Sequence, residues 1–191
     1  PFDDVPEIVS VVEEPVAAMR AYTWATNALI SLGQSDRAQP HVDDALVLSQ
    51  AIRDLYWHTR ALNGKARMAY LMGDWVEALK ITDELLSAAP QDNAGLSLRV
   101  IVEYQIGNFD EGRERIDRLL NQQFGLAGVS AAICIAMAAR ISGQAELLEH
   151  LVTYLNPTVR TVYNAPLAIS LVELALSFVA IQNGDAGSAS N

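Results

Sequence analysis

Five glycines recur along this chain at intervals of 34 to 41 residues, at positions 33, 73, 107, 143 and 184. Each follows a stretch with apolar residues at helical spacing and precedes a short polar turn. A helix often ends on a residue in the left-handed conformation, which glycine adopts without a steric penalty. The spacing therefore predicts a helix end at each glycine and a repeating unit of about one helix pair.

A small residue follows five positions after four of these glycines, as Ala38, Ala78, Gly112 and Ala189. Two helices that cross closely need a small side chain where their backbones approach. We therefore expect each glycine to join two helices that pack on each other. Leu148 takes this position in the fourth interval, so we expect that pair to be splayed or shifted. No long stretch alternates with period two, and the sequence predicts an all-α chain.

The helix before each glycine, called here a first helix, is predicted in five ranges: Pro15–Leu32, Leu55–Met72, Asn93–Ile106, Leu126–Ser142 and Asn164–Asn183. The helix after it, called a second helix, is predicted in four ranges: Ser35–Ile52, Trp75–Ala89, Phe109–Gln122 and Gln144–Leu155. Pro90 and Pro157 follow two of the second helices, as expected of a residue that cannot continue a helix. Pro40 lies in the first turns of its helix, where it is able to shift the start.

Residues Gly73–Leu79, with Pro90 twelve residues after Ala78, resemble the tetratricopeptide repeat (TPR), a helix–turn–helix unit of 34 residues. Residues Gly107–Gly112 repeat the pattern 34 positions later. The resemblance covers roughly residues 19–191. It implies a right-handed α-solenoid of antiparallel helix pairs, with about four to five pairs. The family's Trp-Leu-Gly-Tyr set of the first helix is mostly replaced, by Leu62, Lys65, Ala66 and Ala69.

On this interpretation, residues 1–14 form an acidic N-terminal segment and residues 15–191 form a single TPR-like helical repeat domain. Its approximate units are 15–52, 55–90, 93–124, 126–157 and an incomplete 164–191. The irregular, alanine-rich texture also resembles the arrays fused behind ATPase, cyclase or transcription-activator domains in large bacterial regulators. That second resemblance implies a fragment of a larger regulator.

The range Leu167–Ile181 has only three polar positions, namely Ser170, Glu173 and Ser177. A terminal helix normally keeps a polar outer face, whereas a helix that is apolar nearly all round is buried. We therefore expect this helix to be covered by a further repeat or by another chain. The second possibility makes it a candidate surface for self-association.

The chain has 191 residues and carries 23 Asp and Glu against 13 Lys and Arg, a formal net charge of −10. Direct nucleic-acid binding relies on Lys and Arg that neutralise phosphates, so we expect no nucleic-acid partner. Leu167–Ile181 spans 15 residues, fewer than the ~20 of a membrane-spanning helix, so we expect no membrane partner. The single cysteine, Cys134, excludes an intrachain disulfide and fits a reducing compartment. We expect a cytoplasmic protein.

No spacing in the sequence indicates catalytic chemistry. His41, His58 and His150 lie in three different predicted helices, without a neighbouring His or Cys, so no metal site is expected. Cys134 lies in an apolar helix, where thiols behave as small inert hydrophobes. The phosphate-binding glycine motifs are absent, so no nucleotide cofactor is expected. We expect no enzymatic activity.

In the TPR family the first helices line the concave groove and the second helices form the outside. The first helices predicted here carry six basic residues against two acidic ones. The second helices carry five basic residues against twelve acidic ones. A chain that curves as the resemblance implies would set a basic groove in an acidic body. This favours a protein or peptide partner that carries an acidic group.

The candidate binding residues form a stripe along the first helices. Arg60, Asn63, Arg67 and Tyr70 fall at i, i+3, i+7 and i+10 of one helix, and coincide with groove-lining positions of the family. The corresponding positions of the neighbouring units are Arg20, Thr23 and Asn27, then Ser97 and Tyr104, then Arg140. Arg and Asn side chains are suited to hold a carboxylate and a peptide backbone, with Tyr packed alongside.

Other interpretations stay open beside this one. Arginines on helices are commonly solvated or paired with acids of a neighbouring helix, here Asp54 or Glu103. The first functional hypothesis is a protein-interaction scaffold that binds a peptide or partner domain in the groove of the first helices. The alternative is an effector-sensing or self-associating region of a larger signalling or transcription regulator.

Overall fold

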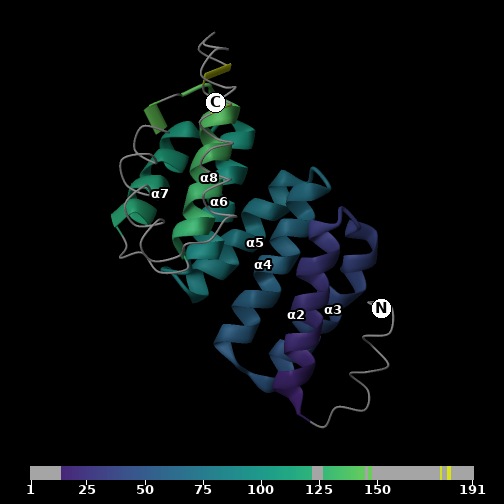
Figure 1. Cartoon of the computed structure of the whole chain (residues 1–191). Coiled ribbons are helices and arrows are strands. Elements are labelled where there is room, and N and C mark those ends of the chain that lie inside the picture. The colour runs from purple at the N-terminus through teal and green to yellow at the C-terminus, as the bar shows by residue number, and fades with distance from the viewer. Residues whose placement is uncertain (1–13, 122–126, 145, 148–176, 178–179, 182–191) are drawn as a thin grey trace, which may run out of the picture. The chain divides into compact units, whose positions relative to one another are not determined.

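The computed structural model describes residues 14–121, 127–144, 146–147, 177 and 180–181. These residues contain helices and turns and no strand, which confirms the all-α prediction for the described part of the chain. Figure 1 shows its seven helices, which keep the following bounds: α2 Pro15–Ser31, α3 Ser35–Ile52, α4 Leu55–Leu71, α5 Trp75–Ala88, α6 Asn93–Ile106, α7 Phe109–Asn121 and α8 Ala127–Ser142.

The helix bounds agree with the predicted ranges to within one residue wherever both ends are described. Pro40 lies inside α3, which still begins at Ser35, so the proline does not shift the start of this helix. It removes one backbone N–H whose acceptor would be the carbonyl of Asp36. Both residues are exposed, so water is available to that carbonyl. The predictions for Gln144–Leu155 and Asn164–Asn183 lie largely outside the described residues.

Four of the five recurring glycines end a helix in the left-handed conformation. Their φ angles are 70°, 80°, 88° and 71° at positions 33, 73, 107 and 143. At the second of them, the N–H of Gly73 donates to the carbonyl of Tyr70 at 3.1 Å, and that of Asp74 donates to Ala69 at 2.9 Å. This pair of bonds satisfies carbonyls that the helix end leaves open. Gly184 lies outside the described residues.

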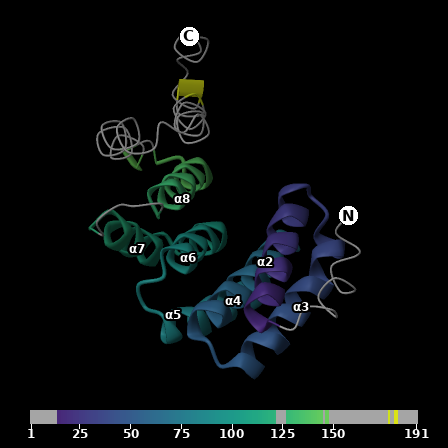
Figure 2. The same ribbon diagram turned by 60° about the horizontal axis from the view of Figure 1, so that its bottom comes forward.

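The contacts divide the chain into two compact units, Pro1–Gly95 and Leu96–Asn191, called unit 1 and unit 2. In unit 1, α2 packs on α3, α4 packs on α5, and α4 also contacts both α3 and α2. Figure 2 shows α2, α3 and α4 lying side by side. Met19 and Leu29 of α2 are fully buried in this core. Two of the predicted small residues, Ala38 and Ala78, are also fully buried, which agrees with close helix approach.

Unit 2 is built on α6, where the residues from Leu96 to Tyr104 are buried except for Arg99. The third predicted small residue, Gly112 of α7, lies against this helix. A Cβ atom at Gly112 would come within 2.5 Å of the Tyr104 ring, so only glycine fits there. Ala189 and Leu148 lie outside the described residues, and the prediction of a splayed fourth pair falls there too.

Unit 2 also buries an ionic cluster. Glu103 of α6 is 1% exposed and accepts from the Nε atoms of Arg99, at 2.7 Å, and of Arg115, at 2.9 Å. The pairing of Glu103 with an arginine was one of the interpretations left open by the sequence. A buried carboxylate needs this kind of compensation, because desolvation of an unpaired charge is costly.

Candidate functional site

The first helices of unit 1, α2 and α4, lie next to each other in a fixed register. The Nη1 of Arg67 donates to the Oδ1 of Asn27 at 2.6 Å, across 40 residues of sequence. The glycines that end the two helices, Gly33 and Gly73, are separated by the same 40 positions. Equivalent positions of the two repeats therefore meet, and two of the predicted binding residues are in direct contact.

A pocket of about 170 Å³ lies where α2, α3 and α4 meet. Residues from all three helices line it: Thr23, Thr26, Asn27, Val42, Ala45, Arg60, Ala61, Asn63 and Gly64. Four of the ten residues at the predicted groove positions, namely Thr23, Asn27, Arg60 and Asn63, are among them. The sequence pattern thus singled out residues of α2 and α4 that the fold brings to one cavity.

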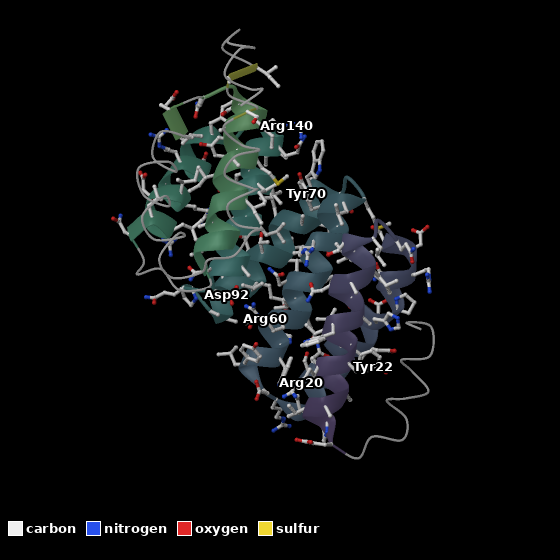
Figure 3. All side chains as sticks on the ribbon, in the orientation of Figure 1. Arg20, Tyr22, Arg60, Tyr70, Asp92 and Arg140 are labelled. Atoms are coloured by element: carbon white, nitrogen blue, oxygen red, sulfur yellow. The ribbon has the colours of Figure 1, made fainter. Side chains whose placement is uncertain are left out.

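Arg60 is held from two sides. Its Nη2 pairs with the Oδ2 of Asp92, and its guanidinium lies 5.6 Å from the ring centroid of Tyr56. The other carboxylate oxygen of Asp92 accepts from the N–H of Gly95 at 2.7 Å and so caps the start of α6. Figure 3 shows Arg60 of α4 beside Asp92. These contacts fix the position of the Arg60 head group at the pocket.

Of the two acids that the sequence offered as arginine partners, Asp54 is not the partner of Arg60. Asp54 precedes α4 and accepts from the N–H of Trp57 at 3.2 Å, as a helix cap does. A residue in the cap position has its carboxylate turned towards the first turn of its own helix. Asp92, which is 32 residues from Arg60 in sequence, takes the place of ion-pair partner instead.

Three buried polar atoms of the pocket residues have no hydrogen-bond partner. They are the Oγ1 atoms of Thr23 and Thr26 and the Nε of Arg60. A buried donor or acceptor without a partner costs roughly 1–3 kcal/mol, and native proteins keep few of them. The described part of the chain holds four more such atoms outside the pocket, on His41, Asn93, Ser97 and Tyr104. A polar group placed in the pocket would satisfy the three that belong to its lining residues.

Arg67 lies beside the pocket with its charge incompletely compensated. The residue is half-buried, and this burial lowers the pKa of its guanidinium from the ordinary value. In the part of the chain that the structure describes, its hydrogen bond goes to the neutral amide of Asn27 and no carboxylate pairs with it. The first-helix face of unit 1 therefore carries a partly desolvated positive charge that an anionic ligand would neutralise.

The remaining predicted binding residues do not line the pocket. Arg20 is exposed on α2, and Tyr70 is half-buried near the end of α4. Figure 3 shows Arg20 towards the N-terminal end of α2. Tyr104 and Arg140 belong to unit 2. Tyr104 is 1% exposed, with its ring centroid 5.4 Å from that of Phe109, so it is a core residue and does not form part of an open groove surface.

Two features of the site, the floor of the pocket and the partner of Arg60, do not follow from the predicted groove positions. Val42 and Ala45 come from α3, a second helix, and were not considered as lining residues. Asp92 had one local signal, because an Asp just before the start of a helix is a common N-cap. Nothing in the sequence connected it to Arg60.

Cys134 is fully buried in unit 2, whereas the His58 side chain of unit 1 is partly exposed and its Nε2 lies 4.0 Å from the Oε1 of Glu84. Burial raises the pKa of the Cys134 thiol to about 12, so the thiol stays protonated and unreactive near neutral pH. The Nδ1 of His58 lies 3.2 Å from the Oγ of Ser49, in contact between α4 and α3. Among the described residues, no group of three His, Cys, Asp or Glu side chains is arranged to hold a metal ion.

Of the helices that the structure describes, none is both long enough and apolar enough to cross a membrane. The candidate self-association segment, Leu167–Ile181, lies almost entirely outside the described residues. No family model, curated protein or solved structure matches the chain.

Proposed function

We propose that the chain is a protein-interaction module of a TPR-like right-handed solenoid, which binds a peptide or partner domain on its first helices. In unit 1 this surface is the face of α2 and α4 that carries Asn27, Asn63 and Arg67. The partner presents an acidic group to it. The module acts by binding and carries out no chemical reaction.

The contact between Asn27 and Arg67 is the single observation that supports this proposal most strongly. It joins equivalent positions of two first helices, and so sets the spacing of the polar groups along the surface. Rigid helices that already present their donors lose little ordering entropy when a ligand binds. Arg67 has no carboxylate partner among the described residues, so it supplies the charge that would recognise an acidic group.

Arg60 has a different part in this proposal from the one its sequence position suggests. Its ion pair with Asp92 uses one edge of the guanidinium, and the Nε remains without a partner. Arg60 therefore contributes a hydrogen-bond donor in a fixed position, its Nε–H, while its charge is compensated by Asp92. We expect Arg67 and the two asparagines to contribute most to partner binding.

A selection from a random peptide library on the immobilised full chain tests the proposal. We expect the selected peptides to be enriched in Asp and Glu, and their affinity to fall about tenfold or more in Arg67→Ala. Lys80→Ala is the matched control, because Lys80 is an exposed cation of the second helix α5 that pairs with Glu77 at 3.3 Å. Peptides without acidic enrichment, or equal losses in both variants, would show that the first-helix surface is not the binding surface.

The second candidate function is an effector-sensing region of a larger regulator. The observation that favours it is the pocket itself, because about 170 Å³ is too small for a peptide segment but adequate for a small molecule. The two functions are compatible, since the pocket lies on the same helices as the proposed peptide surface.

A further inference from the structure

The size of the pocket limits its occupant to a small group. An apolar cavity of about 150 Å³ in another protein holds one benzene molecule, which has six non-hydrogen atoms. The pocket between α2, α3 and α4 has about 170 Å³. A ligand that fills it therefore has about six non-hydrogen atoms.

The polar side of the pocket is rich in hydrogen-bond donors. Asn27 and Asn63 bring amide groups, Thr23 and Thr26 bring hydroxyls, and Arg60 brings an N–H. The Oδ1 of Asn27 already accepts from Arg67, which leaves its amide hydrogens as donors. Among the described residues that line the pocket, none is acidic. An ionised carboxylate only accepts hydrogen bonds and so complements this set.

Three of these donor groups have no partner within the protein, namely Thr23, Thr26 and the Nε of Arg60. A neutral ligand would satisfy them weakly, whereas hydrogen bonds to a carboxylate are roughly twice as strong as bonds between neutral groups. Arg67, one helical turn from Asn63, adds a positive charge without a carboxylate partner in the described part of the chain. The electrostatic balance of the site therefore favours an anion.

The other side of the pocket is apolar and has space left by small residues. Val42, Ala45 and Ala61 are between 1% and 4% exposed, and Gly64 contributes no side chain. An inorganic anion such as phosphate has no part that would pack against these residues. A short aliphatic stem would fill this side and gain about 0.8 kcal/mol for each buried methylene, which corresponds to about a fourfold change in affinity.

We propose that this pocket binds a free monocarboxylate with a short aliphatic stem, of the size of butyrate, as a small effector. The carboxylate accepts from Arg60 and from the hydroxyls of Thr23 and Thr26, and the stem packs on Val42, Ala45 and Ala61. The proposal rests on the second candidate function, the effector-sensing region, for which it names the ligand class, and it does not depend on the peptide-binding function.

Isothermal titration calorimetry of the full chain, at constant ionic strength, tests which ligand size the pocket accepts. The ligands are acetate, propionate, butyrate and hexanoate. We expect the affinity to rise about fourfold for each methylene up to butyrate and to fall for hexanoate. Butyramide, which has the same shape without the charge, should bind about tenfold more weakly. Equal affinity for butyramide, no dependence on stem length, or tighter binding of phosphate would each overturn the proposal.

Gly64→Ala tests the location. A Cβ atom there would lie 3.4 Å from the Cγ2 of Thr26 and 3.7 Å from that of Val42, in ordinary contact, so the fold tolerates it. The methyl group takes up part of the pocket, and we expect butyrate binding to fall at least tenfold while the melting temperature is kept or raised. Unchanged butyrate binding in a folded Gly64→Ala protein would overturn the location.

Thr26→Val tests the hydrogen bonds, with Thr82→Val as its matched control. Thr82 is also a buried helical threonine of unit 1, but its Oγ1 donates to the carbonyl of Ala78 at 2.9 Å and it does not line the pocket. We expect Thr26→Val to lose butyrate binding without loss of stability, and Thr82→Val to keep butyrate binding. The reverse pattern would contradict the proposal.

Peptide selection separates this proposal from the proposed function. If butyrate fails to bind while acidic peptides are selected and depend on Arg67, the effector proposal is wrong and the interaction module stands. If butyrate binds as expected while no acidic peptides are enriched, the effector site stands and the interaction module is wrong.

Discussion

Arg67 and Asn27 are joined by a hydrogen bond of 2.6 Å that spans 40 residues of sequence and links the first helices of two successive units. The contact pairs a cation with a neutral amide, so the helix-to-helix connection leaves the charge of Arg67 uncompensated by a carboxylate within the described part of the chain. An Asp in place of Asn27 would pair with Arg67 and add to the stability of the fold. Under the proposed function, an acidic group of the partner would supply the missing negative charge.

Asn27→Asp should raise stability and reduce anion binding. The new carboxylate would pair with Arg67 and contribute about 0.5–1 kcal/mol to the free energy of unfolding, because the contact is partly exposed. Tryptophan fluorescence in urea measures this unit selectively, since Trp24, Trp57 and Trp75 all lie in unit 1. In an Arg67→Met background the gain should disappear, and a loss of stability in the wild-type background would contradict the prediction.

Asp92→Asn and Asp92→Ala should separate the two contacts of Asp92. Asparagine keeps the cap on the N–H of Gly95 but removes the ion pair with Arg60. We expect the loss of this ion pair to lower the free energy of unfolding by about 1–2 kcal/mol. Alanine also removes the cap and should cost about 1 kcal/mol more. Urea unfolding of both variants measures the difference. Equal stability of the two variants would show that the cap contributes nothing.

Glu103→Gln should destabilise unit 2 strongly. The change removes the charge that compensates two arginines, and breaking a buried ion pair in this way costs about 3–5 kcal/mol. Because unit 2 contains no tryptophan, the rate at which Cys134 reacts with a thiol reagent in rising urea is the suitable measurement. If Cys134 becomes reactive at the same urea concentration in Glu103→Gln as in the wild type, Arg99 and Arg115 have found other partners.

Gly112→Ala should be harmful where Gly64→Ala is not. The added Cβ would lie 2.5 Å and 2.6 Å from two atoms of the Tyr104 ring, and overpacking of this kind costs about 1–3 kcal/mol. A second change, Tyr104→Leu, makes room and should recover part of the loss. Thermal unfolding followed by circular dichroism compares the three proteins. If the second change recovers nothing, the clash with Tyr104 is not the cause.

Cys134 should react only when unit 2 opens, and should make stability fall at high pH. Its pKa is raised to about 12 in the fold, from an ordinary value of 9.0, because burial disfavours the thiolate. As the pH rises, the unfolded chain loses the Cys134 proton before the folded chain does. The contribution of Cys134 to the free energy of unfolding is therefore fully present below about pH 9 and is lost between about pH 9 and 12. Cys134→Ala should show a smaller decrease over that range, measured by urea unfolding at each pH.

Much of the local structure could be predicted from the sequence, and the reasons are local. The helix ends at Gly33, Gly73, Gly107 and Gly143 follow from a backbone conformation that glycine adopts most easily. The small residues Ala38, Ala78 and Gly112 were predicted at close approaches and are all buried. In contrast, Tyr104 occupies a predicted groove position but is buried against α7, because helix periodicity does not tell which face of α6 is covered.

At the candidate site, some features follow from the sequence and others follow only from the tertiary structure. The repeat spacing alone determined which residues of α2 and α4 are equivalent, and so put Asn27, Asn63 and Arg67 on one surface. Only the packed helices decided that Asp92 would hold Arg60 and that Val42 and Ala45 would close the floor of a pocket. The physical reason is that a backbone preference acts within a few residues, whereas a shared cavity depends on the register and direction of side chains from separate helices.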